Sequence, residues 1–235
     1  MKISVVVPAY NEEKYIGMTL SSIKALSVKE DWTVEILVIN GGSTDNTKEV
    51  AIKYGAKVID EPHKGIGFAR QEGKKHAKGK IIAFTDADTV VPKDWLLRHV
   101  TELSQPNVAF TYGTFRVTDG KFPYYHFINF IQPHYLWLIH HLFGKPIAAG
   151  QNLAFWREKA LRVGGFDDKI LLFEDVDFAI RMKKTGDVKF IPDLVVISSG
   201  RRSNEGWSFF IRMSIVSFKY FVLGRRSLGG FPDFR

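Results

Sequence analysis

Two acidic clusters, far apart in the chain, contain the residue types that could do chemistry. Asp86-Ala87-Asp88 places two carboxylates one residue apart, directly after an apolar run. Such a pair can point to one side and share a hard divalent cation, because Mg²⁺ needs only one or two carboxylates beside substrate phosphates. The cation would screen a diphosphate and stabilise it as a leaving group. The alternative interpretation is an acidic turn before a helix that begins near Pro92.

The second cluster is Glu174-Asp175, at the start of a helix predicted over 174–184. A carboxylate at a helix N-terminus is stabilised as the anion, so it stays able to accept a proton from an alcohol. This pattern therefore predicts a general base. The alternative is that both acids only balance the helix dipole, since acidic first turns are common.

The first half of the chain alternates short β-branched runs with helical patterns, and this half must position the clusters. Strands are predicted over 3–7, 34–39, 57–59 and 80–85. The alternation predicts βαβ units and a parallel sheet with right-handed crossovers. Ligands of such sheets bind beyond the carboxyl ends of the strands. We therefore expect the polar segments that follow the strands to share one rim.

The second half is rich in aromatic residues. The run 122–143 is predicted to be kinked or broken at Pro133, and 207–223 is apolar nearly all round. A charge inside the segment 207–223, such as Arg212, would cost ~3 kcal/mol at a bilayer centre. A helix formed by this segment is therefore expected to lie in the membrane interface and not to span the membrane. The division is one domain over 1–206, with a C-terminal amphipathic helix and tail over 207–235.

The net charge and the residue composition restrict the function class. The 235 residues are 45% hydrophobic and include no cysteine, which excludes a disulfide framework, Cys-ligated metals and thiol catalysis. The formal charge of +8 suits nucleic acid, phosphorylated small molecules or an anionic membrane. No nucleic-acid partner is expected, because the aromatics do not interleave with Lys and Arg. No signal peptide precedes the first strand, which predicts a cytoplasmic protein.

Arg225 and Arg226, adjacent to the apolar tail, add the expectation of peripheral binding to the anionic inner face of the cell membrane. The alternative is that 122–143 and 207–223 pack on the sheet or form a dimer interface. The sequence leaves the choice open, and it leaves the oligomeric state unknown.

The order of the motifs resembles family-2 glycosyltransferases with a GT-A fold, over about residues 3–207. The matching segments are 5–13, 42–47, 65–70, 86–88, 164–167 and 174–177. The resemblance implies an α/β, Rossmann-like, mostly parallel sheet flanked by helices, with the C-terminal amphipathic helix as an appendage. It also implies inverting transfer of a sugar from a nucleoside-diphosphate donor to an acceptor hydroxyl, on a lipid-linked or polysaccharide acceptor. That displacement needs a base on one side and positive charge on the other.

The resemblance also implies roles for single residues. Asp175 would be the general base, and Glu174 would help to position the acceptor. Asp88, with Asp86, would hold Mn²⁺ or Mg²⁺. The residues implied on the donor side are Pro8, Ala9, Tyr10, Glu12, Asn40, Arg70, Asp86 and Ala87. Those implied on the acceptor side are Gly150, Gln151 and Asn152, and those implied in a phosphate-closing loop are Arg201 and Arg202.

Two features of the sequence depart from the family's pattern or leave an assignment open. Asn40-Gly41 stands where many members of the family have two acidic residues, so the donor base is left open, and no third metal ligand is evident. Arg70, taken by itself, would reach a phosphate or a base or lie in solvent. The alternative function is a catalytically silent nucleotide-sugar-binding or membrane-surface module on the same fold.

Overall fold

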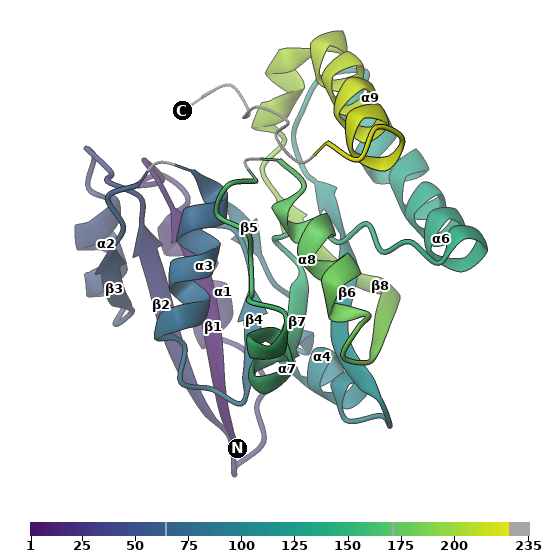
Figure 1. Ribbon diagram of the computed structural model, residues 1–235. Coiled ribbons are helices and arrows are strands. Elements are labelled where there is room, and N and C mark those ends of the chain that lie inside the picture. The colour runs from purple at the N-terminus through teal and green to yellow at the C-terminus, as the bar shows by residue number, and fades with distance from the viewer. Residues whose placement is uncertain (64, 171, 226–235) are drawn as a thin grey trace.

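The computed structural model describes residues 1–63, 65–170 and 172–225. Lys64, Arg226 and the rest of the predicted tail lie outside these residues. Within them, the strands form one eight-stranded sheet with the order β3-β2-β1-β4-β7-β6-β8-β5 (Figure 1). The strands are β1 (Lys2–Ala9), β2 (Thr33–Asn40), β3 (Lys57–Asp60), β4 (Ile81–Phe84), β5 (Thr89–Val90), β6 (Val108–Val117), β7 (Leu153–Trp156) and β8 (Asp187–Ser198).

Helices cover both faces of this sheet. They are α1 (Ile16–Lys24), α2 (Thr47–Lys53), α3 (Ile66–His76), α4 (Trp95–Leu103), α5 (Tyr124–His126), α6 (Gln132–Phe143), α7 (Arg157–Arg162), α8 (Glu174–Met182) and α9 (Trp207–Phe221). A π-helical turn, η1 (Phe127–Ile131), precedes α6, and a 3₁₀ turn, η2 (Arg201–Glu205), precedes α9.

The first half of the sheet is parallel, as the sequence predicts. β1 pairs in parallel with β2 and with β4, and β2 pairs in parallel with β3. The valines of β1 are fully buried because both faces of the strand are covered, which explains the continuous apolar run. The predicted strands 3–7, 34–39, 57–59 and 80–85 each fall on an observed strand.

The second half is mixed. β7 is antiparallel to both of its neighbours, β4 and β6, while β6 and β8 run parallel to each other. The two-residue strand β5 closes the edge against β8, where Thr89 pairs with Ser198. This last ladder joins the segment that follows Asp88 to the end of the C-terminal strand.

Two apolar layers hold the sheet between its helices. On one face, α1 and α4 contribute side chains such as Leu20 and Leu96. On the other, α3, α7 and α8 contribute Ala69, Ala160 and Phe178. Gly73 lets α3 approach the sheet closely, because a Cβ at this position would overlap the side chain of Val6.

The aromatic segment and the C-terminal helix lie side by side at one end of the molecule (Figure 1). Phe127 and Phe210 meet edge to face with ring centroids 5.1 Å apart, and Tyr124 meets Phe209 at 4.9 Å. The predicted break falls at η1, just before Pro133 in the first turn of α6. None of the helices formed by residues 1–63, 65–170 and 172–225 has the length and apolar character needed to cross a membrane.

Candidate active site

Three strand ends bring the first group of predicted residues together. In the parallel register Ala9 faces Asn40 across β1 and β2, and Val6 faces Phe84 across β1 and β4. The segments that follow these strands therefore start at the same edge of the sheet, as predicted. Ala9 also accepts the backbone N–H of Gly41 at 2.9 Å, which ties the first two turns together.

Asn40 is buried and its amide is used inside the protein. Its Nδ2 donates to Asp60 Oδ1 at 2.9 Å, and its Oδ1 accepts the backbone N–H of Ser43 at 3.1 Å. Lys48 holds the other oxygen of Asp60 at 2.6 Å. The sequence reasoning did not single out Asp60, although it ends the strand next to Asn40 and its position at a strand end was the available signal.

Arg70 occupies the centre of the site. Its guanidinium bonds Glu174, lies 3.1 Å from Asp86 Oδ1 and lies 3.6 Å from Asp175 Oδ2. The side chain is only 4% exposed. The alternative that Arg70 lies in solvent is therefore wrong, because this buried cation joins both acidic clusters; its contact with a donor stays a prediction.

Gly150 is the residue that makes room for this cation. A Cβ at position 150 would overlap the guanidinium of Arg70, so a larger residue here would displace the guanidinium. The Gly150 N–H also donates to Asp175 Oδ2 at 2.8 Å. Gly150 therefore orients the carboxylate that the sequence predicts as the base.

Asp175 and Glu174 begin α8 but play different structural parts. Asp175 Oδ1 accepts the N–H of Val176 at 2.8 Å, and its side chain keeps 16% exposure. Burial raises the pKa of Asp175, while Arg70 opposes the rise. Burial raises the pKa of Glu174 to about 8, and the charge of Asp175 adds to the rise while Arg70 opposes it. Of the two, Asp175 is the more exposed carboxylate.

Glu174 is 6% exposed, and its carboxylate pairs with the buried Arg70. The resemblance implies that it positions the acceptor. In this arrangement it can do so only through Arg70, because its carboxylate points to the guanidinium.

Asp88 belongs to a second ionic group, formed with Arg201 and Glu12. Its Oδ2 is 3.0 Å from Arg201 Nη2, and the same guanidinium makes two hydrogen bonds to Glu12, at 2.8 and 2.6 Å. Burial raises the pKa of Asp88 to about 6, although the charge of Arg201 lowers it. Glu12 is therefore a partner of Arg201 in this structure.

Arg202 turns away from its neighbour. Its Nη1 lies 3.8 Å from Glu205 Oε1, and Glu205 also pairs with Arg212 of α9. Of the two arginines predicted for a phosphate loop, Arg201 contacts Asp88, and Arg202 contacts Glu205 at the end of η2.

The carboxylates suit a hard divalent cation when diphosphate oxygens complete its coordination. Asp86 and Asp88 have oxygen ligands of the right type, and each has a different cationic partner, Arg70 and Arg201. In the part of the chain that is described, no group of three or more His, Asp or Glu side chains is placed to hold a metal. The donor set therefore fits Mn²⁺ or Mg²⁺ only together with a substrate phosphate.

Asn152 lies in the core and not at an acceptor surface. It is fully buried, its Nδ2 donates to the carbonyls of Thr114 and Leu194, and its Oδ1 accepts Trp95 Nε1–H at 2.9 Å. Its contact with His99 is part of the same network, in which burial lowers the pKa of His99 to about 3. The acceptor-side prediction for Asn152 is therefore corrected, and Gln151 is the partly exposed neighbour.

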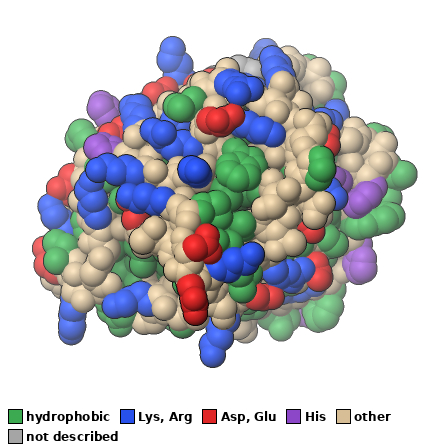
Figure 2. All heavy atoms as spheres, turned by 90° about the horizontal axis from the view of Figure 1, so that it is seen from below, with side chains coloured by type: hydrophobic (Ala, Val, Ile, Leu, Met, Phe, Trp, Pro, Cys, Tyr) green, Lys and Arg blue, Asp and Glu red, His purple; other side chains and the backbone are tan. Residues whose placement is uncertain are grey.

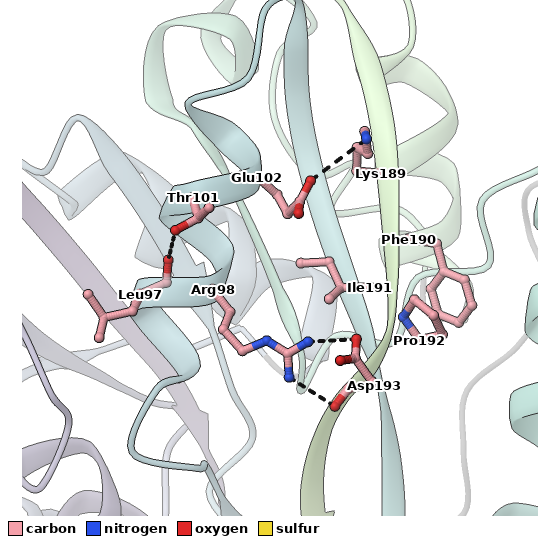
Figure 3. Close-up of a pocket in the computed structure, with 9 residues that line it drawn as sticks. All are labelled: Leu97, Arg98, Thr101, Glu102, Lys189, Phe190, Ile191, Pro192 and Asp193. Atoms are coloured by element: carbon pink, nitrogen blue, oxygen red, sulfur yellow. Dashed lines mark hydrogen bonds and ion pairs between the residues drawn. The ribbon is translucent and has the colours of Figure 1, made fainter.

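A groove of about 450 Å³ lies elsewhere, between α4 and β8 (Figure 3). Its charged side chains pair with each other, Arg98 with Asp193 at 2.6 Å and Glu102 with Lys189 at 3.8 Å. It contains none of the predicted site residues.

The positive charge is spread out on the face seen in Figure 2. Lys and Arg side chains are numerous there, with Asp and Glu between them and an apolar area at the centre. This distribution does not by itself select a partner.

Comparison with known proteins starts from sequence. The model of the family described as "Glycosyl transferase family 2" matches residues 4–164. The probable glycosyltransferase YdaM of Bacillus subtilis (strain 168) is 31% identical over 227 residues, which are 90% of this chain and 53% of that protein. The glucosyltransferase WfgD of Escherichia coli, named for UDP-Glc and α-D-GlcNAc-diphosphoundecaprenol, is 30% identical over 123 residues, 51% of this chain and 47% of that protein. The chain thus spans about half the length of these relatives.

Among solved structures, the mannosyltransferase PcManGT from Pyrobaculum calidifontis, in complex with GDP-Man and Mn²⁺, has a TM-score of 0.75. It is 23% identical, and the match covers 98% of this chain and 65% of that one. This likeness confirms the predicted fold class, a mostly parallel sheet flanked by helices. Because the family model matches more than half of the chain, the chain belongs to glycosyl transferase family 2.

Proposed function

We propose that this chain transfers a sugar from a nucleoside-diphosphate sugar to an acceptor hydroxyl, with inversion at the anomeric carbon and Asp175 as the general base. The observation that carries the proposal is the setting of Asp175. Its carboxylate is oriented by the N–H of Gly150 and faces the charge of Arg70 at 3.6 Å, yet keeps partial exposure. A carboxylate so held can receive a proton without reorganising.

The proposed step balances in one displacement. The acceptor oxygen attacks the anomeric carbon as its proton passes to Asp175, and a new C–O bond forms. The bond from the anomeric carbon to the phosphate oxygen breaks, and the nucleoside diphosphate leaves with the electron pair. Burial raises the pKa of Asp175, which makes it a stronger proton acceptor than an exposed aspartate.

Asp88, with Asp86 beside it, is the group proposed to hold Mn²⁺ or Mg²⁺. The cation, when bound, supplies positive charge to the leaving diphosphate. This chain's own part is to present Asp88 at the strand edge and to keep Asp86 fixed on Arg70, at 3.1 Å. The Mn²⁺ named with PcManGT supports a metal of this class.

The donor side is proposed to be the turn after β1 and its neighbours. Pro8, Ala9 and Tyr10 leave the sheet beside Asn40, and Ala87 lies between the two aspartates. The relatives named above act on or bind UDP-Glc and GDP-Man, respectively. We therefore propose a nucleoside-diphosphate sugar as the donor and leave its base open.

The acceptor is proposed to be carried by a lipid, and the enzyme to work at the surface of an anionic membrane on the inner face of the cell. The support is the apolar surface of α6 and α9, where Leu142, Trp207 and Ile211 are each more than half exposed. Lys145 stands 5.0 Å from the ring of Phe221, a place where its charge can meet lipid phosphates while its stem covers apolar surface. The lipid diphosphate in the name of WfgD also supports this choice.

The catalytic proposal is tested with Asp175→Asn. The amide keeps an oxygen for the Gly150 N–H but cannot take the proton, so transfer should fall by at least about a thousandfold. A thermal-shift screen of nucleoside diphosphates and their sugars with Mn²⁺ first identifies the donor, and its stabilisation should be unchanged in the variant. Full activity in the variant would refute Asp175 as the base. Donor binding without transfer in the wild type, across acceptors, would favour the silent binding module.

The membrane proposal is tested by vesicle sedimentation. The protein should pellet with anionic phosphatidylglycerol vesicles more than with phosphatidylcholine vesicles, and Trp207→Ser with Ile211→Ser should abolish the difference. Ile52→Ser is the matched control, because Ile52 is 56% exposed on α2, away from this surface. Equal and negligible pelleting of the wild type would end the membrane proposal.

A further inference from the structure

Arg201 is the cation that neutralises the carboxylates on the donor side. It begins η2, three residues after β8 ends, and lies over the ring of Tyr15 at 5.2 Å. Its guanidinium bonds Glu12 twice and Asp88 once, and its side chain is 20% exposed. Glu12 and Arg201 are 189 residues apart in the sequence, so their contact forms only in the folded protein.

One nitrogen serves both acids. Arg201 Nη2 lies 2.6 Å from Glu12 Oε1 and 3.0 Å from Asp88 Oδ2. Glu12 is 3% exposed and Asp88 is 13% exposed, so their negative charges are poorly screened by water. A positive charge between them is needed, and here the guanidinium supplies it.

The three bonds are not equivalent. Two go to Glu12, in the forked geometry that suits a carboxylate, and one goes to Asp88. Breaking the contact with Asp88 would leave Arg201 anchored on Glu12 through both terminal nitrogens and would release one N–H of Nη2. A guanidinium N–H donates to a phosphate oxygen as well as to a carboxylate.

We propose that Arg201 competes with the divalent cation for Asp88, and that on donor binding it exchanges Asp88 for the diphosphate while Glu12 holds it in place. This inference rests on the proposed function, since it takes Asp88 as the metal-binding carboxylate. A divalent cation that binds alone must displace the guanidinium of Arg201 from Asp88 without giving it a new partner. A divalent cation that binds together with a diphosphate displaces the guanidinium as well, but the diphosphate then becomes its new anionic partner.

The proposal predicts two opposite effects of removing Arg201. Without its guanidinium, Glu12 and Asp88 repel each other and attract a cation, so Mn²⁺ alone binds more tightly. The nucleoside diphosphate loses a partner, so it binds less tightly in the presence of Mn²⁺. An arginine that only supports the fold would not move the two affinities in opposite directions.

The experiment is a titration of Mn²⁺ into wild type and Arg201→Gln, with free Mn²⁺ followed by electron paramagnetic resonance and no nucleotide present. We expect Kd for Mn²⁺ to fall at least about tenfold in the variant, since a charge-assisted bond no longer opposes the metal. Kd for UDP and GDP, measured calorimetrically at saturating Mn²⁺, should rise about tenfold for whichever the wild type binds. Arg98→Gln removes the same charge in the α4–β8 groove and should change neither value.

Arg201→Lys keeps the experiment decisive if Arg201→Gln does not fold. Lysine retains the charge but not the fork, so Mn²⁺ should bind between the wild-type and glutamine values. Mn²⁺ affinity equal to the wild type in both variants, or no Mn²⁺ binding in either, would overturn the inference. Failure of the proposed function is a different result, namely a wild type that binds neither nucleoside diphosphate at saturating Mn²⁺.

Discussion

Replacing Arg70 by glutamine should move the pH dependence of catalysis. Arg70 Nη1 lies 3.6 Å from Asp175 Oδ2; Arg70 is buried, and Asp175 is partly buried. At an effective dielectric constant of ~20, two unit charges at that distance attract by about 4–5 kcal/mol, equivalent to roughly three pKa units. Relaxation of the site reduces this figure, so we expect the pKa of Asp175 to rise by about one to three units in Arg70→Gln.

The assay is kcat/KM against pH from 5 to 10, at saturating Mn²⁺, with release of the nucleoside diphosphate as the signal. A base must be ionised to act, so the acid limb of the profile should shift upward by the same one to three units. The variant should therefore lose activity at the acid end of the profile and regain part of it at high pH. Arg70→Lys keeps the charge, so its acid limb should stay near that of the wild type although its rate falls.

The unfolding free energy of Arg70→Gln should also depend on pH, and it should fall below that of the wild type as the pH rises. Without the cation the folded-state pKa values of Glu174 and Asp175 rise further above their unfolded values. A raised carboxyl pKa contributes stability below the unfolded pKa and loses it as pH rises through the folded pKa. The variant should thus be close to the wild type near pH 5 and lose about 3–5 kcal/mol of unfolding free energy near pH 8. An unchanged acid limb in a folded Arg70→Gln protein would refute the reasoning.

Three further outcomes follow from single contacts. Burial raises the pKa of Glu174 to about 8, so its contribution to stability is lost as the pH rises from about 4.5 to 8. Glu174→Gln should make the unfolding free energy, measured by denaturant titration, less dependent on pH over this range. An unchanged pH dependence would contradict this. Asn152→Ala leaves Trp95 Nε1–H and two carbonyls without partners and should lower the unfolding free energy by about 3 kcal/mol or more, against less than about 0.5 for the exposed control Thr101→Ala. Gly73→Ala should cost about 1–3 kcal/mol in thermal unfolding, since its methyl meets Val6; a gain would mean that α3 shifts freely.

The parallel half of the sheet could be predicted because its strands are buried on both faces. Such strands give unbroken β-branched runs, as in Val5-Val6-Val7, and the intervening helices have clear periodicity. The second half gives no such signal. β6 contains Gly113, which contacts Asn152, and β8 contains Pro192, so neither reads as a regular central strand.

The site could be predicted as residue types but not as contacts. The acidic clusters stand out because each places two carboxylates close together in sequence, one pair directly after an apolar run and the other at the start of a helical pattern. Arg70, by contrast, lies on a helix with an ordinary basic pattern, and its burial depends on Gly150 from a distant segment. Asn152 shows the opposite failure, because the resemblance implies an acceptor-side residue whereas the folded sheet buries the side chain completely. The predicted boundary between 206 and 207 stays a prediction.

The short ladder between β5 and β8 places the segment around Asp88 close to the chain that leads into α9. Thr89 Oγ1 and Ser198 Oγ lie 2.8 Å apart, one residue beyond Asp88 and three before Arg201. The same few residues lead through η2 into α9. A displacement of α9, for example when its apolar side binds a membrane, would therefore act through η2 on Arg201 and on its contact with Asp88. Binding at the outer surface and the proposed exchange of partners at Arg201 would then be coupled through only a few residues.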